Sequence, residues 1–145
     1  MRYSRPAVMG IINATPDSFH AASRACTEAE VAGRAERMAA EGADMLDVGA
    51  CSTRPGASAP DAYTEWARLE PALRAVRKAV GEDMPVSVDT FRAEVARRAV
   101  ESGMADIVND IGGGTLDAAM FDTVAGLRVP YVLMHMRGTP ADMQT

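Results

Sequence analysis

The sequence contains little cysteine, few aromatic residues and no long apolar run. Its two cysteines, Cys26 and Cys51, are too few for the disulfide framework of a small secreted domain. No apolar run approaches the roughly 20 residues that a membrane-spanning helix needs, and the N-terminus lacks the apolar centre of a signal peptide. These absences predict a cytoplasmic protein that neither spans nor binds a membrane.

The charge pattern excludes another class of partner. The net charge is −5, and acidic and basic residues are interspersed rather than gathered in blocks. Proteins that bind nucleic acid present a basic surface to the phosphates, and this sequence offers none. Its 145 residues and 48% hydrophobic content are sufficient for one domain with a packed core. We therefore expect a globular domain that does not bind nucleic acid.

A short apolar run followed by a helical pattern recurs along the chain. The clearest example covers residues 85–90, where β-branched residues end at Asp89 and helical spacing begins at Phe91. Similar runs predict strands over residues 7–12, 44–48, 106–108 and 131–134, with helices between them. Every connection is long enough for a right-handed crossover between parallel strands. The sequence therefore predicts an α/β fold with about five parallel strands and four helices.

Polar residues stand at the predicted strand ends, namely Asn13, Asp89, Asn109 and His135. Both a doubly wound open sheet and part of a (β/α)₈ barrel fit the order of elements. A barrel gathers polar groups from many strand ends around one rim. A nucleotide-binding open sheet would show a glycine-rich turn after its first strand, which is missing here. The barrel is therefore favoured.

Five motifs in this chain resemble those of the dihydropteroate synthases, the pterin-binding enzymes of folate biosynthesis that sulfonamides inhibit. They occur in the family's order and at its spacing, and together they cover the chain nearly end to end. Any one of them alone would be a weak signal. The motifs are MGIINATPDSF at residues 9–19, DVG with STRPGA within residues 47–57, SVDT at residues 87–90, NDI at residues 109–111 and MHMRG at residues 134–138.

The resemblance implies a (β/α)₈ TIM barrel. Such a barrel needs roughly 250 residues, so residues 1–145 are expected to form the N-terminal part of a single pterin-binding barrel domain. The implied reaction joins 6-hydroxymethyl-7,8-dihydropterin diphosphate to p-aminobenzoate and yields 7,8-dihydropteroate and diphosphate. Mg²⁺ is the implied cofactor.

The resemblance also implies roles for individual residues. Asp89 and Asn109 match the residues that hold the pterin, and with Arg54 they form the implied catalytic set. Asn13 matches the residue that helps to hold Mg²⁺ and diphosphate. The other implied substrate contacts are Asp17, Phe19, Thr53, Pro55, Ile111 and Met134.

The chemistry of these residue types suits the implied reaction. A carboxylate such as Asp89 can accept two adjacent N–H groups from the pyrimidinone edge of a pterin. An amide such as Asn109 supplies both a donor and an acceptor for the rest of that edge. Loss of diphosphate leaves a cation at the pterin methylene, which nearby negative charge stabilises, while Arg54 and Mg²⁺ would neutralise the departing group. No covalent nucleophile is required.

Each residue also has a purely structural interpretation. Asp89 or Thr90 could cap the third helix, Asn13 could fix a turn, and Arg54 could be a solvated loop charge. A second class of function also stays open, namely a pterin-binding relative without turnover or a barrel like those that present methyl-tetrahydrofolate to corrinoid enzymes. The Ser-Thr-Arg-Pro-Gly loop favours the synthase, because a methyl-transfer barrel needs neither p-aminobenzoate nor diphosphate.

Two departures from the family pattern accompany the resemblance. Residues 20–23 read HAAS where relatives usually carry a second aspartate and a glycine pair, and Cys51 stands where relatives commonly have glutamate. Five parallel strands cannot close a barrel, so the first and last strands would have unpaired edges. We therefore expect a homodimer or another self-associated form, and we expect the 145-residue chain alone to be inactive.

Overall fold

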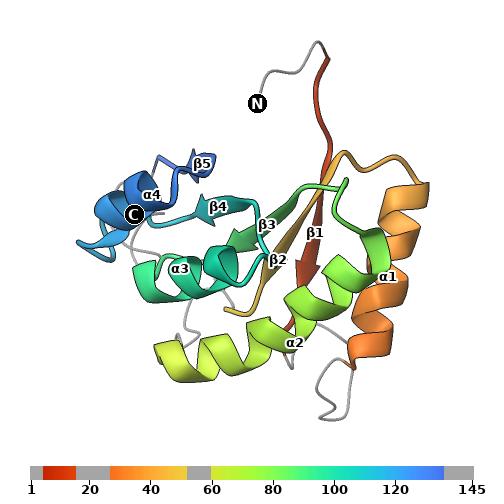
Figure 1. Ribbon diagram of the computed structural model, residues 1–145, viewed down its shortest axis with the longest axis horizontal. Coiled ribbons are helices and arrows are strands. Elements are labelled where there is room, and N and C mark those ends of the chain that lie inside the picture. The colour runs from red at the N-terminus through yellow and green to blue at the C-terminus, as the bar shows by residue number, and fades with distance from the viewer. Residues whose placement is uncertain (1–4, 16–26, 52–59, 136–145) are drawn as a thin grey trace, which may run out of the picture.

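A computed structural model describes residues 5–15, 27–51 and 60–135 of the chain (Figure 1). Strands and helices alternate through this part of the chain. In order, the elements are β1 (Met9–Asn13), α1 (Glu28–Ala40), β2 (Met45–Gly49), α2 (Ala62–Val80), β3 (Val86–Asp89), α3 (Ala93–Glu101), β4 (Ile107–Asp110), α4 (Met120–Leu127) and β5 (Tyr131–Leu133).

The strands form one parallel sheet in the order β1-β2-β3-β4-β5, so each strand pairs with the next one along the chain. The helices follow the same order, with α1 against α2, α2 against α3 and α3 against α4 (Figure 1). A doubly wound sheet would reverse its strand order and place helices on both faces. The unbroken order is that of an incomplete (β/α)₈ barrel, which confirms the predicted fold class.

The core lies between the sheet and the layer of helices. Alternate strand residues point toward the helices, and the fully buried ones are Ile12, Leu46, Val48, Val86, Val88 and Val108. The helices contribute Val31, Ala35, Leu69, Leu73, Val76, Val95, Ala96, Ala99, Met120 and Val124. Burial of each larger side chain contributes about 1.5–3 kcal/mol relative to exposure, so this layer holds the strands at fixed spacing.

Side chains cap the first two helices but not the third. Thr27 and Glu30 form a capping box at α1, and Asp61 caps α2 by accepting a bond from the Thr64 amide at 2.7 Å. Neither Asp89 nor Thr90 is the N-cap of α3, which is Arg92 without a side-chain cap. The Ala93 amide instead donates to Asp117 Oδ2 at 2.8 Å.

The face of the sheet opposite the helices keeps several apolar residues exposed. Ile11 on β1 is 58% exposed and Val132 on β5 is 43% exposed. Within the described residues, β1 and β5 each pair with one strand. The described helices include none with the length and apolar character needed to cross a bilayer.

Candidate functional site

Four residues lie at one level of the sheet, at the carboxyl ends of β1 to β4. The Cα of Asn13 is in register with Gly49, Gly49 with Asp89, and Asp89 with Asn109. Residues in register on neighbouring strands share a face of the sheet. Because the residue before each of them belongs to the core, the side chains of Asn13, Asp89 and Asn109 lie on the face away from the helices.

Asp89 is partly buried, and its environment disfavours the ionised carboxyl. Burial, and then the negative charges of Asp47, Glu65 and Asp110, raise its pKa to about 7. Gly49 makes room for this side chain, since a Cβ at that position would lie 2.9 Å from Asp89 Oδ2. A carboxyl that titrates near neutrality at a strand end is typical of a functional site.

Asp47 on β2 is a site residue that the sequence analysis did not single out. Its carboxylate lies on the same face as Asp89, two residues before Gly49, and is 2% exposed. Asn109 Nδ2 donates to Asp47 Oδ2 at 3.0 Å, so this bond reaches across β3 from β4 to β2. The bond fixes the orientation of the Asn109 amide, and burial raises the pKa of Asp47.

The loop after β4 is organised around the buried carboxylate of Asp110. Its Oδ1 accepts from the Gly112 amide at 2.7 Å, and its Oδ2 accepts from the Gly114 amide at 2.7 Å and from the Tyr131 hydroxyl at 2.6 Å. Burial and the Asp110 carboxylate raise the pKa of Tyr131. These contacts are within the protein, so Asp110 supports the loop rather than faces a ligand.

Two predicted substrate contacts flank this loop. Ile111 follows β4 directly and is half-buried. Met134 follows β5, is 39% exposed, and donates its amide to the Asp110 carbonyl at 3.2 Å. Gly113 has φ +57°, and a Cβ there would lie 2.5 Å from the Met134 carbonyl oxygen, so the exits of β4 and β5 are closely packed.

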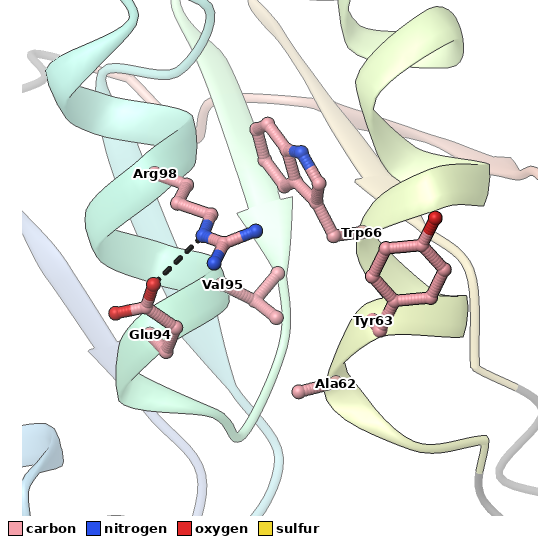
Figure 2. Close-up of a pocket in the computed structure, with 6 residues that line it drawn as sticks. All are labelled: Ala62, Tyr63, Trp66, Glu94, Val95 and Arg98. Atoms are coloured by element: carbon pink, nitrogen blue, oxygen red, sulfur yellow. Dashed lines mark hydrogen bonds and ion pairs between the residues drawn. The ribbon is translucent and has the colours of Figure 1, made fainter.

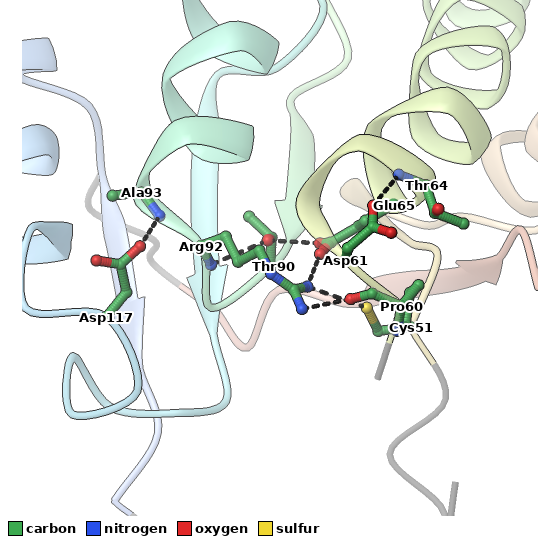
Figure 3. A network of polar contacts seen from close by, with 9 residues as sticks. All are labelled: Cys51, Pro60, Asp61, Thr64, Glu65, Thr90, Arg92, Ala93 and Asp117. Carbon is green, nitrogen blue, oxygen red and sulfur yellow. Dashed lines mark hydrogen bonds and ion pairs between the residues drawn. The ribbon is translucent and has the colours of Figure 1, made fainter. Parts of the chain in front are cut away.

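A polar network lies between the starts of α2 and α3 and includes Thr90, the residue after Asp89 (Figure 3). The Glu65 side chain is fully buried, and its Oε1 accepts from the Thr90 hydroxyl at 2.6 Å. Its Oε2 pairs with Arg92 Nη1. Arg92 also donates to the Pro60 carbonyl and, at 3.8 Å, to Cys51 Sγ.

The surroundings of Cys51 disfavour a reactive thiol. Burial and the neighbouring Glu65 carboxylate raise its pKa to about 12, whereas a nucleophilic cysteine needs a lowered pKa. The Glu65–Arg92 network had no signal in the sequence, because its members are 27 residues apart and a helical glutamate is typical of a solvated surface.

Five of the predicted site residues lie outside the described residues: Asp17, Phe19, Thr53, Arg54 and Pro55. Asn13, Asp89, Asn109, Ile111 and Met134 lie within them, all at the carboxyl ends of the strands or just beyond. The structure thus brings the three polar residues Asn13, Asp89 and Asn109 to one edge of the sheet.

The described residues can supply only a small part of the coordination shell of a Mg²⁺ ion. They contain no group of three or more His, Cys, Asp or Glu side chains placed to hold a metal ion. The Asn13 side chain is exposed and offers one carbonyl oxygen. Mg²⁺ commonly keeps several waters and takes its other ligands from substrate phosphates, so a single amide oxygen is compatible with an ion that arrives with diphosphate.

A separate pocket of about 220 Å³ lies between α2 and α3, on the helix side of the sheet (Figure 2). Tyr63 and Trp66 line one wall, and the Glu94–Arg98 ion pair lines the other. Because Asp89 lies on the opposite face of the sheet, this pocket is not part of the site.

The chain is similar to known pterin enzymes over nearly its whole length. Residues 9–145 match the family described as "Pterin binding enzyme". The mitochondrial folate synthesis bifunctional protein of Pisum sativum is 50% identical over 141 residues, which are 97% of this chain and 27% of that protein.

Solved structures show the same similarity. The dihydropteroate synthase of Yersinia pestis in a sulfonamide drug complex has a TM-score of 0.84 and 38% identity, over 97% of this chain and 50% of that one. The Xanthomonas albilineans enzyme with 4-aminobenzoic acid has a TM-score of 0.80 and 44% identity, over 93% of this chain and 48% of that one. The chain thus spans about half the length of each of these synthases.

Proposed function

Since the chain belongs to the pterin-binding enzyme family, we propose that it provides the pterin-binding part of a dihydropteroate synthase. The proposed reaction condenses 6-hydroxymethyl-7,8-dihydropterin diphosphate with p-aminobenzoate, giving 7,8-dihydropteroate and diphosphate. This is an alkyl-group transfer in folate biosynthesis.

The observation that carries the proposal is the placement of Asp89 and Asn109 side by side at the carboxyl edge of the sheet. A pterin ring presents adjacent N–H donors together with a carbonyl and a ring nitrogen on one edge. The Asp89 carboxylate can accept the paired donors. Asn109 Nδ2 is held by Asp47, so the amide keeps its oxygen and its second N–H for the remainder of the edge.

The same carboxylates suit the proposed chemistry. When diphosphate leaves, positive charge develops at the pterin methylene, and the negative charges of Asp47 and Asp89 stabilise it. An arylamine is a weak nucleophile, so a dissociative path is favoured, and exclusion of water protects the cation from hydrolysis. The chain's own groups therefore bind and stabilise, and no covalent intermediate on the protein is needed.

Charge on the diphosphate must be neutralised as it departs. We assign this to Arg54, and we assign to Asn13 one oxygen ligand for Mg²⁺. When bound, Mg²⁺ supplies Lewis-acid stabilisation of the leaving oxygens. Thr53, Pro55, Asp17 and Phe19 are proposed to contact p-aminobenzoate. The structure of the Xanthomonas albilineans relative with 4-aminobenzoic acid supports an arylamine as the second substrate.

The proposed setting is the cytoplasm, and the proposed assembly is a homodimer or another self-associated form. The low cysteine content supports a reducing compartment. The exposed apolar residues on the open face of the sheet support self-association.

Binding and turnover test the function separately. Isothermal calorimetry with the bare pterin alcohol should give saturable binding to the 145-residue chain, weakened in Asp89→Asn. An assay with both substrates and Mg²⁺ should then release one diphosphate per dihydropteroate formed. Absence of pterin binding would overturn the proposed function.

A pterin-binding relative without turnover is the second candidate. The described residues supply the proposed pterin contacts Asp89 and Asn109, but they contain no group of three or more His, Cys, Asp or Glu side chains that could hold a metal ion, and pterin binding alone needs no metal. Pterin binding without diphosphate release, in the presence of both substrates and Mg²⁺, would select this candidate over the synthase.

A further inference from the structure

Arg92 contacts both ends of the segment that joins β2 to α2. Its guanidinium donates to the Pro60 carbonyl and, at 3.8 Å, to Cys51 Sγ. These two residues bracket residues 52–59, the segment that contains Thr53, Arg54 and Pro55. One side chain from the following strand–helix unit therefore holds both stems of this connection (Figure 3).

The guanidinium is held in place by its own partners. It pairs with Glu65 on α2 and lies over the ring of Phe91, with Cζ 4.5 Å from the ring centroid. The Arg92 side chain is 19% exposed and Glu65 is 0% exposed. A fully buried carboxylate is costly unless it is paired and hydrogen-bonded, so Glu65 requires this arginine.

The same network extends to Thr90, the residue that follows Asp89. Glu65 Oε1 accepts from the Thr90 hydroxyl at 2.6 Å, and that hydroxyl oxygen accepts from the Arg92 amide at 3.1 Å. Thr90 directly follows Asp89. The stems of the β2–α2 connection are thus joined to the end of β3 by side chains rather than through the sheet alone.

We propose that Arg92, held by Glu65, is a positioning residue that fixes Cys51 and Pro60 relative to Asp89. The inference rests on the proposed function, because the connection it holds carries Arg54 and the proposed p-aminobenzoate contacts. Arg92 itself touches no substrate. Loss of Arg92 should therefore weaken the contacts made from this connection, to p-aminobenzoate and through Arg54 to the diphosphate, while the contacts of Asp89 and Asn109 with the pterin ring stay in place.

The test compares Arg92→Gln and Arg92→Lys with Arg97→Gln in the whole protein. Arg97 is the matched control, because it lies on α3, whose N-cap is Arg92, and pairs with Glu94 and Glu101 at the surface. We expect Arg92→Gln to raise the KM for p-aminobenzoate about tenfold, as loss of hydrogen bonds to a charged group predicts, with the affinity for the bare pterin alcohol within twofold of wild type. Lysine can pair with Glu65 but lacks the fork needed for both stems, so Arg92→Lys should be intermediate.

Hydrogen exchange measured by mass spectrometry provides a readout that does not need turnover. In Arg92→Gln, amides in residues 46–51 and 60–69 should exchange about tenfold faster, with residues 86–88 unchanged. Unchanged exchange at the two stems would overturn the proposal, as would a loss of affinity for the bare pterin alcohol as large as the rise in the KM for p-aminobenzoate. A wild-type chain that neither binds pterin nor turns over would overturn the proposed function, and the exchange data would still decide the role of Arg92.

Discussion

At the scale of single residues, burial and neighbouring carboxylates disfavour the ionised form of the Asp89 carboxyl. A pterin that donates hydrogen bonds to it would favour that form. We predict that Asp89→Asn weakens binding of the pterin alcohol by about 1.5–3 kcal/mol, because a hydrogen bond to a charged group is lost. Calorimetry at pH 8 measures the change. Asp83→Asn is the control, since it removes an exposed carboxylate outside the site. Equal affinities of wild type and Asp89→Asn would remove Asp89 from the pterin site.

The raised pKa of Asp89 also predicts how stability depends on pH. The folded state holds the Asp89 proton up to pH about 7, whereas the unfolded state releases it near pH 4. The stabilisation from this proton is therefore lost as pH rises through about 7. We expect Asp89→Asn to raise the free energy of unfolding by about 1–3 kcal/mol at pH 8, and the gain to shrink as pH falls toward 4.

Urea unfolding of wild type, Asp89→Asn and the control Asp83→Asn across pH 4–8 measures this dependence. If the difference between wild type and Asp89→Asn did not change with pH, the Asp89 carboxyl would titrate at its ordinary pKa. The same experiment separates a binding loss from a folding loss, because the variant is expected to bind pterin more weakly while it unfolds less readily.

Arg54 is predicted to act on the diphosphate rather than on the pterin ring. Arg54→Ala should lower turnover of the pterin diphosphate at least tenfold, as loss of charge-assisted contacts predicts, and leave binding of the bare pterin alcohol within twofold. Arg74→Ala is the control, because Arg74 forms an exposed ion pair with Glu70 on α2. Equal losses for both ligands would indicate that Arg54 has a purely structural role.

Residue-level reasoning from the sequence found the polar strand ends but not their neighbours. Asp89 and Asn109 stand where an apolar run stops, and that position predicts function in parallel sheets. Asp47 stands inside a strand, and its bond to Asn109 crosses an intervening strand. Such a contact depends on the register of three strands, which no local pattern encodes. Glu65 was missed for the same reason, since its partners come from a different strand–helix unit.

At the scale of elements, hydrophobic periodicity was sufficient for the order and type of strands and helices. The predicted strand over residues 44–48 is observed as Met45–Gly49, and the one over residues 131–134 as Tyr131–Leu133. The start of α3 was less predictable. Helical spacing suggested Phe91, but the helix begins at Ala93, whose amide bonds to Asp117 from a later connection. Helix ends set by distant side chains cannot be read from local sequence.

The packing of β2 against β3 at the site gives a prediction at this scale. A Cβ at Gly49 would lie 2.9 Å from Asp89 Oδ2 and 3.3 Å from Asp89 Cβ. We expect Gly49→Ala to displace the carboxyl, weaken pterin binding several-fold and cost about 1–3 kcal/mol of stability. Gly33→Ala is the control, because a Cβ there meets nothing within 4 Å and alanine favours the helix. Crystal structures of both variants with calorimetry would show whether Asp89 moves.

At the scale of the whole molecule, the site lies on the face of the sheet that the helices do not cover. One face of the sheet is covered by helices, whereas the other carries the polar edge with Asn13, Asp89 and Asn109. In the described part of the chain, the same face exposes Ile11 and Val132. In a closed barrel, residues in these positions fill the interior. The open face therefore combines a specific polar edge with apolar surface that favours association.

We predict that the 145-residue chain self-associates through this face. Exposed apolar side chains next to strands with an unpaired edge favour contact with another chain. Ile11→Lys together with Val132→Lys should shift the sedimentation profile toward monomer at concentrations where wild type is associated. Tyr63→Lys is the control, since Tyr63 is 79% exposed but lies on the helix side. A wild-type chain that stays monomeric, or a Tyr63→Lys variant that dissociates to the same extent, would contradict association through the open face.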